Sequence, residues 1–207
     1  MDLQHQAILD TPPEPAFDRV VHLAARMFRA PMAAISYLDE DRQWFKARVG
    51  LSARQTPRTF AFCEHTIRQS DVMVVPDATQ DPRFTGNPLV TGQPHVRFYA
   101  GVPIRSPRGT VLGTLCVFDS APRLDFSAGD RGALTHLADL VVDAMELRLA
   151  HRSRVEQAQY FRQLADAMPG MIWTTRPEGG CDYVNKTWLA FKGSTLEKEL
   201  GYGWQDG

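Results

Sequence analysis

Cysteine is scarce in this sequence: only Cys63, Cys116 and Cys181 occur among its 207 residues. An odd number of separate cysteines makes no disulfide framework and suits a reducing compartment, so we expect a cytoplasmic protein. Long apolar runs are also lacking, since none approaches the ~18 residues that cross a bilayer. The N-terminus has no apolar signal-peptide segment either. We therefore expect no membrane partner.

An excess of positive charge is also missing. Lys and Arg number 23 against 24 for Asp and Glu, which gives a formal net charge of −1. Without a basic surplus to hold a phosphate backbone, we expect no nucleic-acid partner. Hydrophobic residues make up 43% of the chain and charged residues 23%, which is ordinary for a globular protein with a sizeable core.

The spacing of apolar residues predicts the order of the elements. Residues 16–31 place apolar side chains at three- and four-residue steps, which indicates a helix that Pro31 ends. The period then changes to the alternation of strands. The further expected elements are two strands around a turn at 39–42, a polar loop, a short helix at 60–70, a short strand at 72–76 and a hairpin at 99–120.

A long helix from about 129 to 168 is predicted next, because Ser127 and Asp130 have capping-box spacing. Thr11 and Glu14 have comparable spacing ahead of the first helix. At ~1.5 Å per residue the long helix would extend about 60 Å, more than one small domain covers. We therefore expect part of it to pair with its copy in a parallel homodimer. The residues expected to form that seam are Leu134, Leu137, Val141 and Ala144. The alternative is a helix that packs on its own domain and ends near Arg148.

Two of the cysteines lie in predicted regular structure. Cys63 stands two residues before His65 on the short helix, but a zinc site needs about four ligands and no CxxC or HxxxH motif accompanies them. Cys116 lies in the last strand, where alternation sets it on the face opposite to Leu115 and Val117. We predict no metal. Packing in the core is the first interpretation of both cysteines, and contact with a ligand is the alternative.

The segment 77–99 is long, polar and interrupted by Pro and Gly. A loop of this length is uncommon unless it has a function, and polar groups among aromatic ones are typical of a ligand pocket. Arg97 beside two aromatic residues would suit an anion. Bracing of the loop by its own polar side chains stays open as an alternative. The candidate ligand-binding residues are Asp77, Arg83, Phe84, His95, Arg97, Phe98 and Tyr99, together with Cys63, His65 and Cys116.

Three stretches carry a family resemblance: FCEHTI at 62–67, the segment 74–104, and GTVLGTLCVFD at 109–119. On these, residues 13–150 resemble a GAF domain of the bacterial sensor-kinase type. The resemblance implies an α+β fold, with an antiparallel sheet flanked by helices and a small-molecule pocket between the sheet and the long loop. The ligands of the family are diverse, so the cofactor is unknown. A covalent bilin is not expected, because the matching segment has His95 but no cysteine.

The C-terminal residues 160–207 resemble the first half of a PAS domain. The resemblance rests on FRQLADAMPGMIWTT, DYVNKTWLAFKG and LGYGW, and it makes Asn185 a helix cap. A whole PAS domain needs about twice this length, so we expect the chain to be a fragment of a longer protein. The expected organisation is a lead-in at 1–12, the GAF-type domain at 13–150, a helical linker at 151–163 and the partial PAS-type domain at 164–207.

These observations predict a cytoplasmic signal-transduction sensor module that senses a small molecule or a partner. The long helix would relay its state to an output domain, a histidine kinase of a two-component system first and a cyclic-dinucleotide enzyme second. The chain has no catalytic motif, so it is not expected to be an enzyme itself. Two alternatives stay open: a GAF-type free-methionine-sulfoxide reductase that uses Cys63 and Cys116, and a dimerisation module without a ligand.

Overall fold

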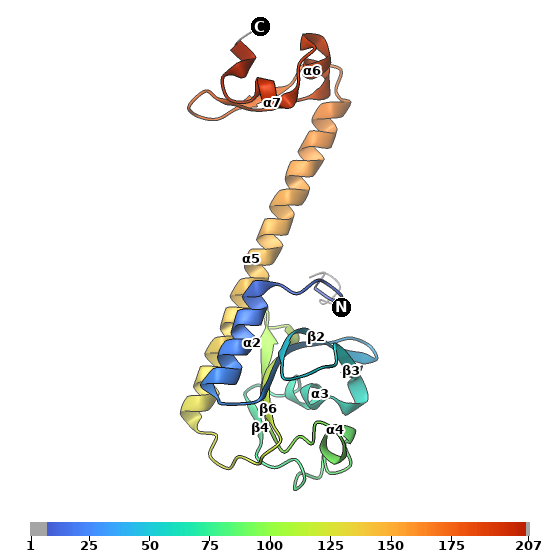
Figure 1. Cartoon of the computed structure of the whole chain (residues 1–207), viewed down its shortest axis with the longest axis vertical. Helices are drawn as coiled ribbons and strands as arrows, with labels where there is room; N and C mark the ends of the chain where they lie inside the picture. The colour runs from blue at the N-terminus through green and yellow to red at the C-terminus, as the bar shows by residue number, and fades with distance from the viewer. Residues whose placement is uncertain (1–7, 206–207) are drawn as a thin grey trace. The chain divides into compact units, whose positions relative to one another are not determined.

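The computed structural model describes residues 8–205, which form two compact units that divide between Leu147 and Arg148 (Figure 1). The first unit is an α+β fold in which an antiparallel sheet has helices on both faces, as the sequence predicts. Among the described residues, no helix combines the length and the apolar character needed to cross a bilayer.

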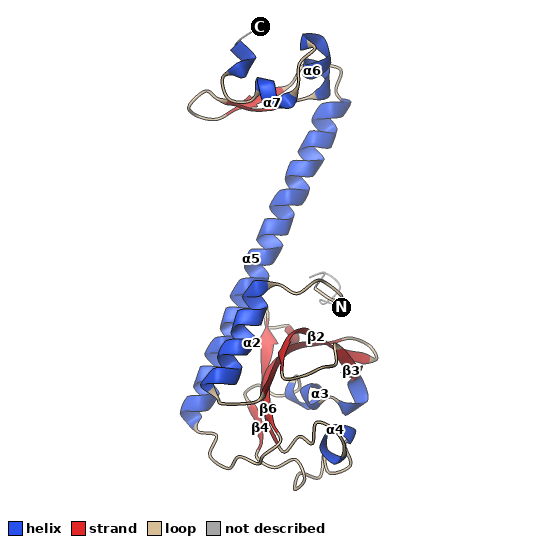
Figure 2. Ribbon diagram, viewed as in Figure 1, coloured by secondary structure: helices blue, strands red, loops and turns tan. Residues whose placement is uncertain are grey.

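Six antiparallel strands make the sheet of the first unit, in the order β3-β2-β1-β6-β5-β4. Figure 2 draws strands in red and helices in blue. The strands are β1 (Met32–Leu38), β2 (Arg42–Val49), β3 (Gln55–Pro57), β4 (Met73–Val75), β5 (Phe98–Arg105) and β6 (Val111–Asp119). The predicted strand pair and hairpin are confirmed. The edge strand β3 falls where the sequence predicts a loop, because a short edge strand lacks apolar alternation.

One face of the sheet is covered by α2 (Pro15–Met27) and by residues 128–147 of α5 (Ala128–Ala167). The residues predicted for a dimer seam lie here, three of them buried in the core and the last half-buried against it: Leu134, Leu137, Val141 and Ala144. The seam prediction is therefore corrected for these residues, which pack within their own chain. A helical apolar stripe has the same spacing whether it covers a sheet or a partner helix.

The opposite face carries η1 (Arg58–Phe60), α3 (Phe62–Thr66) and α4 (Pro88–Thr91), with a second apolar cluster beneath them. The predicted alternation of β6 is confirmed. Leu115 and Val117 belong to the cluster under α2 and α5, and Cys116 and Phe118 belong to the cluster under α3. The central strands thus send side chains into both cores.

The predicted capping box at the start of α5 is confirmed. The Asp130 backbone N–H donates to Ser127 Oγ at 3.1 Å, and the Ser127 N–H donates to Asp130 Oδ2 at 2.8 Å. The corresponding prediction at Thr11 is wrong, because α2 begins at Pro15 and its N-cap is Glu14. The Thr11 hydroxyl instead donates to the Ile8 carbonyl at 2.6 Å and accepts from the Lys46 ammonium at 2.8 Å.

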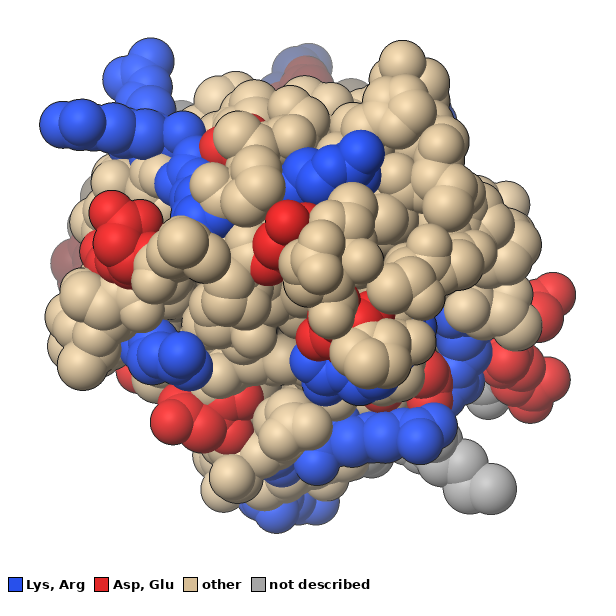
Figure 3. Space-filling model, turned by 90° about the horizontal axis from the view of Figure 1, so that it is seen from below, with Lys and Arg blue, Asp and Glu red and all other residues tan. Residues whose placement is uncertain are grey.

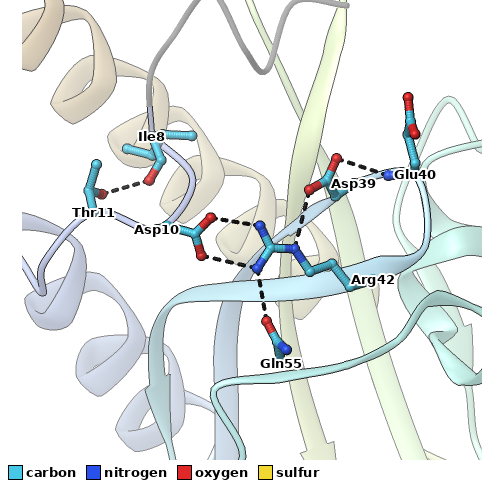
Figure 4. Close-up of polar contacts among 7 residues, drawn as sticks. All are labelled: Ile8, Asp10, Thr11, Asp39, Glu40, Arg42 and Gln55. Atoms are coloured by element: carbon cyan, nitrogen blue, oxygen red, sulfur yellow. Dashed lines mark hydrogen bonds and ion pairs between the residues drawn. The ribbon is translucent and has the colours of Figure 1, made fainter.

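The segment before α2 is attached to the sheet through Arg42 of β2 (Figure 4). The Arg42 guanidinium donates to both carboxylate oxygens of Asp10 at 2.7 and 3.0 Å. It also donates to Asp39 at 3.2 Å and to Gln55 of β3 at 2.9 Å. The hydrogen bonds from Arg42 lower the pKa of Asp10. One side chain therefore joins the N-terminal segment to two strands.

The second unit contains residues 148–167 of α5 and a small two-stranded sheet. The sheet pairs β7 (Trp173–Thr175) with β8 (Cys181–Val184). The short helices of this unit are α6 (Lys186–Lys192), α7 (Leu196–Glu199) and η2 (Gly203–Gln205). Asn185 caps α6 as predicted, since its Oδ1 accepts from the Trp188 N–H at 3.1 Å. Its amide also donates to the carbonyls of Ala165 and Gly170 at 2.8 and 2.9 Å, which joins α5 to α6.

Candidate functional site

A cavity of about 340 Å³ lies on the α3 face of the sheet. Its floor is buried and formed by Gln43 and Phe45 of β2, Phe62 of α3 and Phe118 of β6. The remaining walls come from the turn at 50–53, from β3 and from the long segment between β4 and β5. The residues that complete the lining are Gly50, Leu51, Ser52, Ala53, Thr56, Leu89, Gln93, Pro94 and Val96. Its size is that of a small-molecule site.

Within residues 8–205, no charged side chain lines this cavity. Its polar groups are the amides of Gln43 and Gln93 and the hydroxyls of Ser52 and Thr56. The Thr56 Oγ1 is buried and has no hydrogen-bond partner among the described residues. An ionic guest would lose hydration here without gaining a counter-charge. Outside the cavity, basic and acidic side chains are interspersed over the face that Figure 3 shows.

The long segment contributes to the cavity through residues other than the predicted ones. Leu89, Gln93, Pro94 and Val96 line it, whereas none of the ten candidate ligand-binding residues does. The segment takes this shape partly through α4, a single helical turn that Asn87 caps by accepting from the Leu89 N–H at 2.9 Å.

The polar candidates in the segment mostly bond to the segment itself. Arg97 donates to the carbonyls of Val90 and Val96 at 2.9 and 3.1 Å. Asp77 accepts from both the side chain and the backbone of Thr79, and these bonds lower the pKa of Asp77. These contacts match the bracing interpretation that the sequence leaves open.

Arg83 and His95 lie at the surface of the same segment. Arg83 forms an ion pair with Asp81 at 2.6 Å, and the hydrogen bond lowers the pKa of that carboxyl. His95 is exposed and has a φ of 59°, in the left-handed region. Neither side chain is part of the cavity wall.

The aromatic candidates separate between the two faces. Phe98 lies in the core under α2 and α5, whereas Phe84 and Tyr99 lie in the core under α3. Phe84 stacks on Phe62 with ring centroids 4.1 Å apart, and it meets the His65 ring edge-on at 5.0 Å. Burial, followed by the charges of Arg83 and Arg68, lowers the pKa of His65. Phe84 therefore packs against Phe62, which lines the cavity, and His65 packs against Phe84.

Cys63 and Cys116 lie close to Tyr99 in the core under α3. The two sulfur atoms are 3.9 Å apart, and the Tyr99 hydroxyl donates to Cys63 Sγ at 3.6 Å. A Cβ on Gly101 would lie 2.1 Å from the Tyr99 hydroxyl, so only glycine leaves room for that ring. Over the described part of the chain, no group of three or more His, Cys, Asp or Glu side chains is arranged to hold a metal ion.

The cavity residues that sequence reasoning misses are neutral and scattered along the chain. Gln43 and Thr56 carry the clearest signal, since an amide and a hydroxyl face an apolar interior. Gln43 alternates with Trp44 along β2, so it is a polar residue at an inward-facing position. A polar residue at a strand position that alternation predicts to be buried can therefore indicate a site in the sequence.

Comparison with known proteins supports one family. The GAF domain family matches residues 12–145. Among curated proteins, a cyclic di-GMP phosphodiesterase of Pseudomonas aeruginosa is 44% identical over 135 residues, which is 65% of this chain and 23% of that protein. A peroxide stress-activated histidine kinase of Schizosaccharomyces pombe is 30% identical over 78 residues, which is 35% of this chain and 5% of that protein. The chain thus spans less than a quarter of either relative.

Solved structures support the same fold. The GAF domain of an Acinetobacter phosphoenolpyruvate-protein phosphotransferase superposes with a TM-score of 0.55 at 20% identity, over 72% of this chain and 92% of that one. A free methionine-R-sulfoxide reductase from Neisseria meningitidis gives 0.53 at 17% identity, over 69% and 84% of the two chains. At these identities the likeness concerns the fold alone. From the sequence match and the fold together, the chain belongs to the GAF domain family.

Proposed function

We propose that the first unit is a sensory domain that binds a small uncharged molecule in the cavity between the sheet and the segment 89–96. The observation that carries this proposal is the lining itself, which is largely apolar and, among the described residues, includes no charged side chain. A ligand with an apolar body and a neutral hydrogen-bonding edge would suit the apolar walls and the side-chain amides of Gln43 and Gln93 without burying a charge. We assign no catalytic role to these residues.

The state of the cavity would reach α5 through the sheet. Phe118 of β6 lines the cavity, and its neighbour Val117 points into the core that contains α5. A second link is the Tyr37 hydroxyl of β1, which donates to Met145 Sδ of α5 at 2.9 Å. Ligand binding that shifts β6 or β1 would therefore change how residues 134–145 pack.

The output is proposed from the relatives. The Pseudomonas aeruginosa protein favours a cyclic-dinucleotide enzyme, because it is more identical and matches over a longer stretch than the Schizosaccharomyces pombe histidine kinase. A histidine kinase remains the second proposal. In either case we infer a cytoplasmic sensor, and we propose that the second unit is the beginning of a PAS domain that α5 connects to the GAF domain.

The test uses the whole chain with the neutral dye N-phenyl-1-naphthylamine and with cyclic di-GMP, each in equilibrium dialysis. We expect the dye to bind and the doubly charged dinucleotide not to bind. Leu89→Trp fills the cavity and should weaken dye binding at least about tenfold, which is roughly 1.4 kcal/mol. Leu124→Trp is the matched control, since Leu124 is 88% exposed and outside the lining.

Equal dye affinity in Leu89→Trp and Leu124→Trp would contradict the cavity assignment. Preferential binding of cyclic di-GMP would contradict the ligand class. For the relay, amide hydrogen exchange at residues 134–145 should slow when the dye saturates the chain. An unchanged exchange pattern in α5 would separate binding from signalling and refute the relay alone.

A further inference from the structure

A polar cluster is enclosed in the core under α3, next to the cavity but outside its lining. It contains the thiols of Cys63 on α3 and Cys116 on β6, both fully buried. Four hydroxyls lie in the same cluster: Ser36 and Thr114 bond each other at 2.8 Å, and Tyr99 bonds Thr66 at 2.5 Å. Buried polar groups are rare in an apolar core and need an explanation when they gather around a nucleophile.

The hydrogen bonds of this cluster converge on one sulfur. Cys63 Sγ accepts from Ser36 Oγ at 3.2 Å, from Gln43 Nε2 at 3.3 Å and from the Tyr99 hydroxyl at 3.6 Å. Cys116 Sγ instead faces a backbone carbonyl, that of Ala34, at 3.4 Å. Donors stabilise a thiolate and a carbonyl acceptor stabilises a thiol, so the two sulfurs are placed for different roles.

The acidities follow the same division. Burial opposes ionisation of Cys63, but hydrogen bonds from Cys116, Ser36 and Thr114 outweigh it and lower the pKa of this thiol. Burial, the hydrogen bond to Cys63 and the charge there raise the pKa of Cys116. The donors around Cys63 and the carbonyl beside Cys116 favour Cys63 as the thiolate when one proton leaves the pair.

The cavity lining includes neighbours of this pair. Gln43 belongs to the cavity lining, and its Nε2 donates to Cys63 Sγ at 3.3 Å. Phe62, the neighbour of Cys63 on α3, and Phe118, two residues beyond Cys116 on β6, also line the cavity. A small neutral oxidant in the cavity would thus contact Gln43, whose amide donates to Cys63.

We propose that Cys63 and Cys116 are a peroxide-reactive dithiol, in which a small hydroperoxide such as hydrogen peroxide enters by the cavity and converts the pair into a disulfide. The inference rests on the two sulfurs and their donors, and it stands whether or not the cavity binds the ligand class proposed above.

The chemistry takes two steps. The Cys63 thiolate attacks one peroxide oxygen, so an S–O bond forms, the O–O bond breaks and the leaving hydroxide takes up a proton to become water. The sulfur, now a sulfenic acid, has lost two electrons to the peroxide. Cys116 then attacks the Cys63 sulfur, an S–S bond forms, the S–O bond breaks, and the departing hydroxide takes the Cys116 proton as a second water.

The second step requires little movement. The sulfur atoms must close from 3.9 Å to the ~2.05 Å of a disulfide, a change that side-chain rotation and a small shift of α3 toward β6 supply. Phe62 would move with α3, so oxidation would alter the wall of the cavity. Reduction by a thiol donor reverses the change.

The experiment treats the whole folded chain with hydrogen peroxide, stops the reaction with catalase, denatures the protein and alkylates it with N-ethylmaleimide. All three cysteines are free thiols before treatment. We expect the alkylated thiols to fall from three to one, because the pair is consumed and Cys181 is left. Peptide mapping should then find Cys63 joined to Cys116, and dithiothreitol should restore all three thiols.

Variants assign the roles. In Cys116→Ser the second step is blocked, so dimedone should trap the sulfenic acid on Cys63. In Cys63→Ser, dimedone should not label Cys116. Cys181→Ser is the matched control and should form the disulfide like the unmodified sequence. Circular dichroism melts identify variants that do not fold, and Cys63→Ala then replaces Cys63→Ser.

Two results would overturn the proposal. One is that three thiols stay alkylatable at peroxide doses that oxidise exposed methionines of the same chain. The other is that the disulfide appears only above the melting temperature, or includes Cys181, which would show random oxidation of unfolded protein.

Discussion

Lys46 shows how a single buried charge can hold a segment in place. It is the extra residue where the register of β2 against β1 shifts, between Phe45 and Ala47. Its side chain is fully buried, lies over the Phe17 ring at 5.2 Å, and forms an ion pair with Glu14 at 2.6 Å. The ammonium also donates to the Pro12 carbonyl at 2.8 Å. The bulge therefore turns a cation toward the start of α2.

Substitutions of Glu14 and of Lys46 should lower the free energy of unfolding by different amounts. Glu14→Gln removes the negative charge that forms an ion pair with the buried ammonium and should lower the free energy of unfolding by about 2 kcal/mol or more. Lys46→Met places an apolar side chain of similar length against Phe17 and leaves Glu14 a third exposed to water, so it should cost less. Urea unfolding of both variants and of the double variant measures the difference. Equal costs for the two single variants would contradict this account.

At the scale of elements, α5 offers a different face for self-association from the one its sequence spacing indicates. Leu134 and Val141 are buried against the sheet. Leu140 and Leu147 are seven residues apart and 47% and 73% exposed, so they lie on a free face of the helix. We propose that a parallel homodimer uses this face.

Cross-linking distinguishes the two faces. Leu147→Cys should give a disulfide-linked dimer on mild oxidation, because equivalent residues of a parallel pair meet at the seam. Val141→Cys is the matched control and should give none, because its side chain points into the core. The three native cysteines are buried and should not contribute to intermolecular links. A strictly monomeric mass by light scattering at tens of micromolar, without a cross-link at residue 147, would discard the dimer.

At the scale of the whole molecule, the two units differ in how much core they have. The first has a six-stranded sheet with an apolar cluster on each face. The second has a two-stranded sheet, and it exposes 54% of Trp173 and 76% of Phe191. Two strands with few covering residues are marginal by themselves in water.

Fragments test this difference. The peptide 160–207 made alone should show no cooperative thermal transition, because its apolar residues lack strands to cover them. Residues 1–147 made alone should melt cooperatively, since both faces of their sheet are covered within that range. A sharp melt of the isolated peptide 160–207, followed by circular dichroism, would show that the second unit is self-sufficient.

The amino-acid sequence by itself determined most of the first unit's sheet and the helices α2 and α5, but not the short elements β3 and α4. Apolar residues at helical steps mark α2, and alternation marks β1, β2, β5 and β6, because each period reports which side of an element is buried. The capping box at Ser127 sets the start of α5, since a reciprocal pair of hydrogen bonds depends only on residues four positions or fewer apart.

Only the tertiary structure decided where the cavity lies and what α5 packs against. Gln43, Thr56 and Leu89 are far apart in the sequence and ordinary in kind, and they become one lining when β2, β3 and α4 meet. The charged residues of the long segment look more like a site, yet Arg97 is bonded to that segment's own carbonyls. Local patterns record that a side chain is buried, but the partner that buries it is set by contacts between distant segments, which have no period in the sequence.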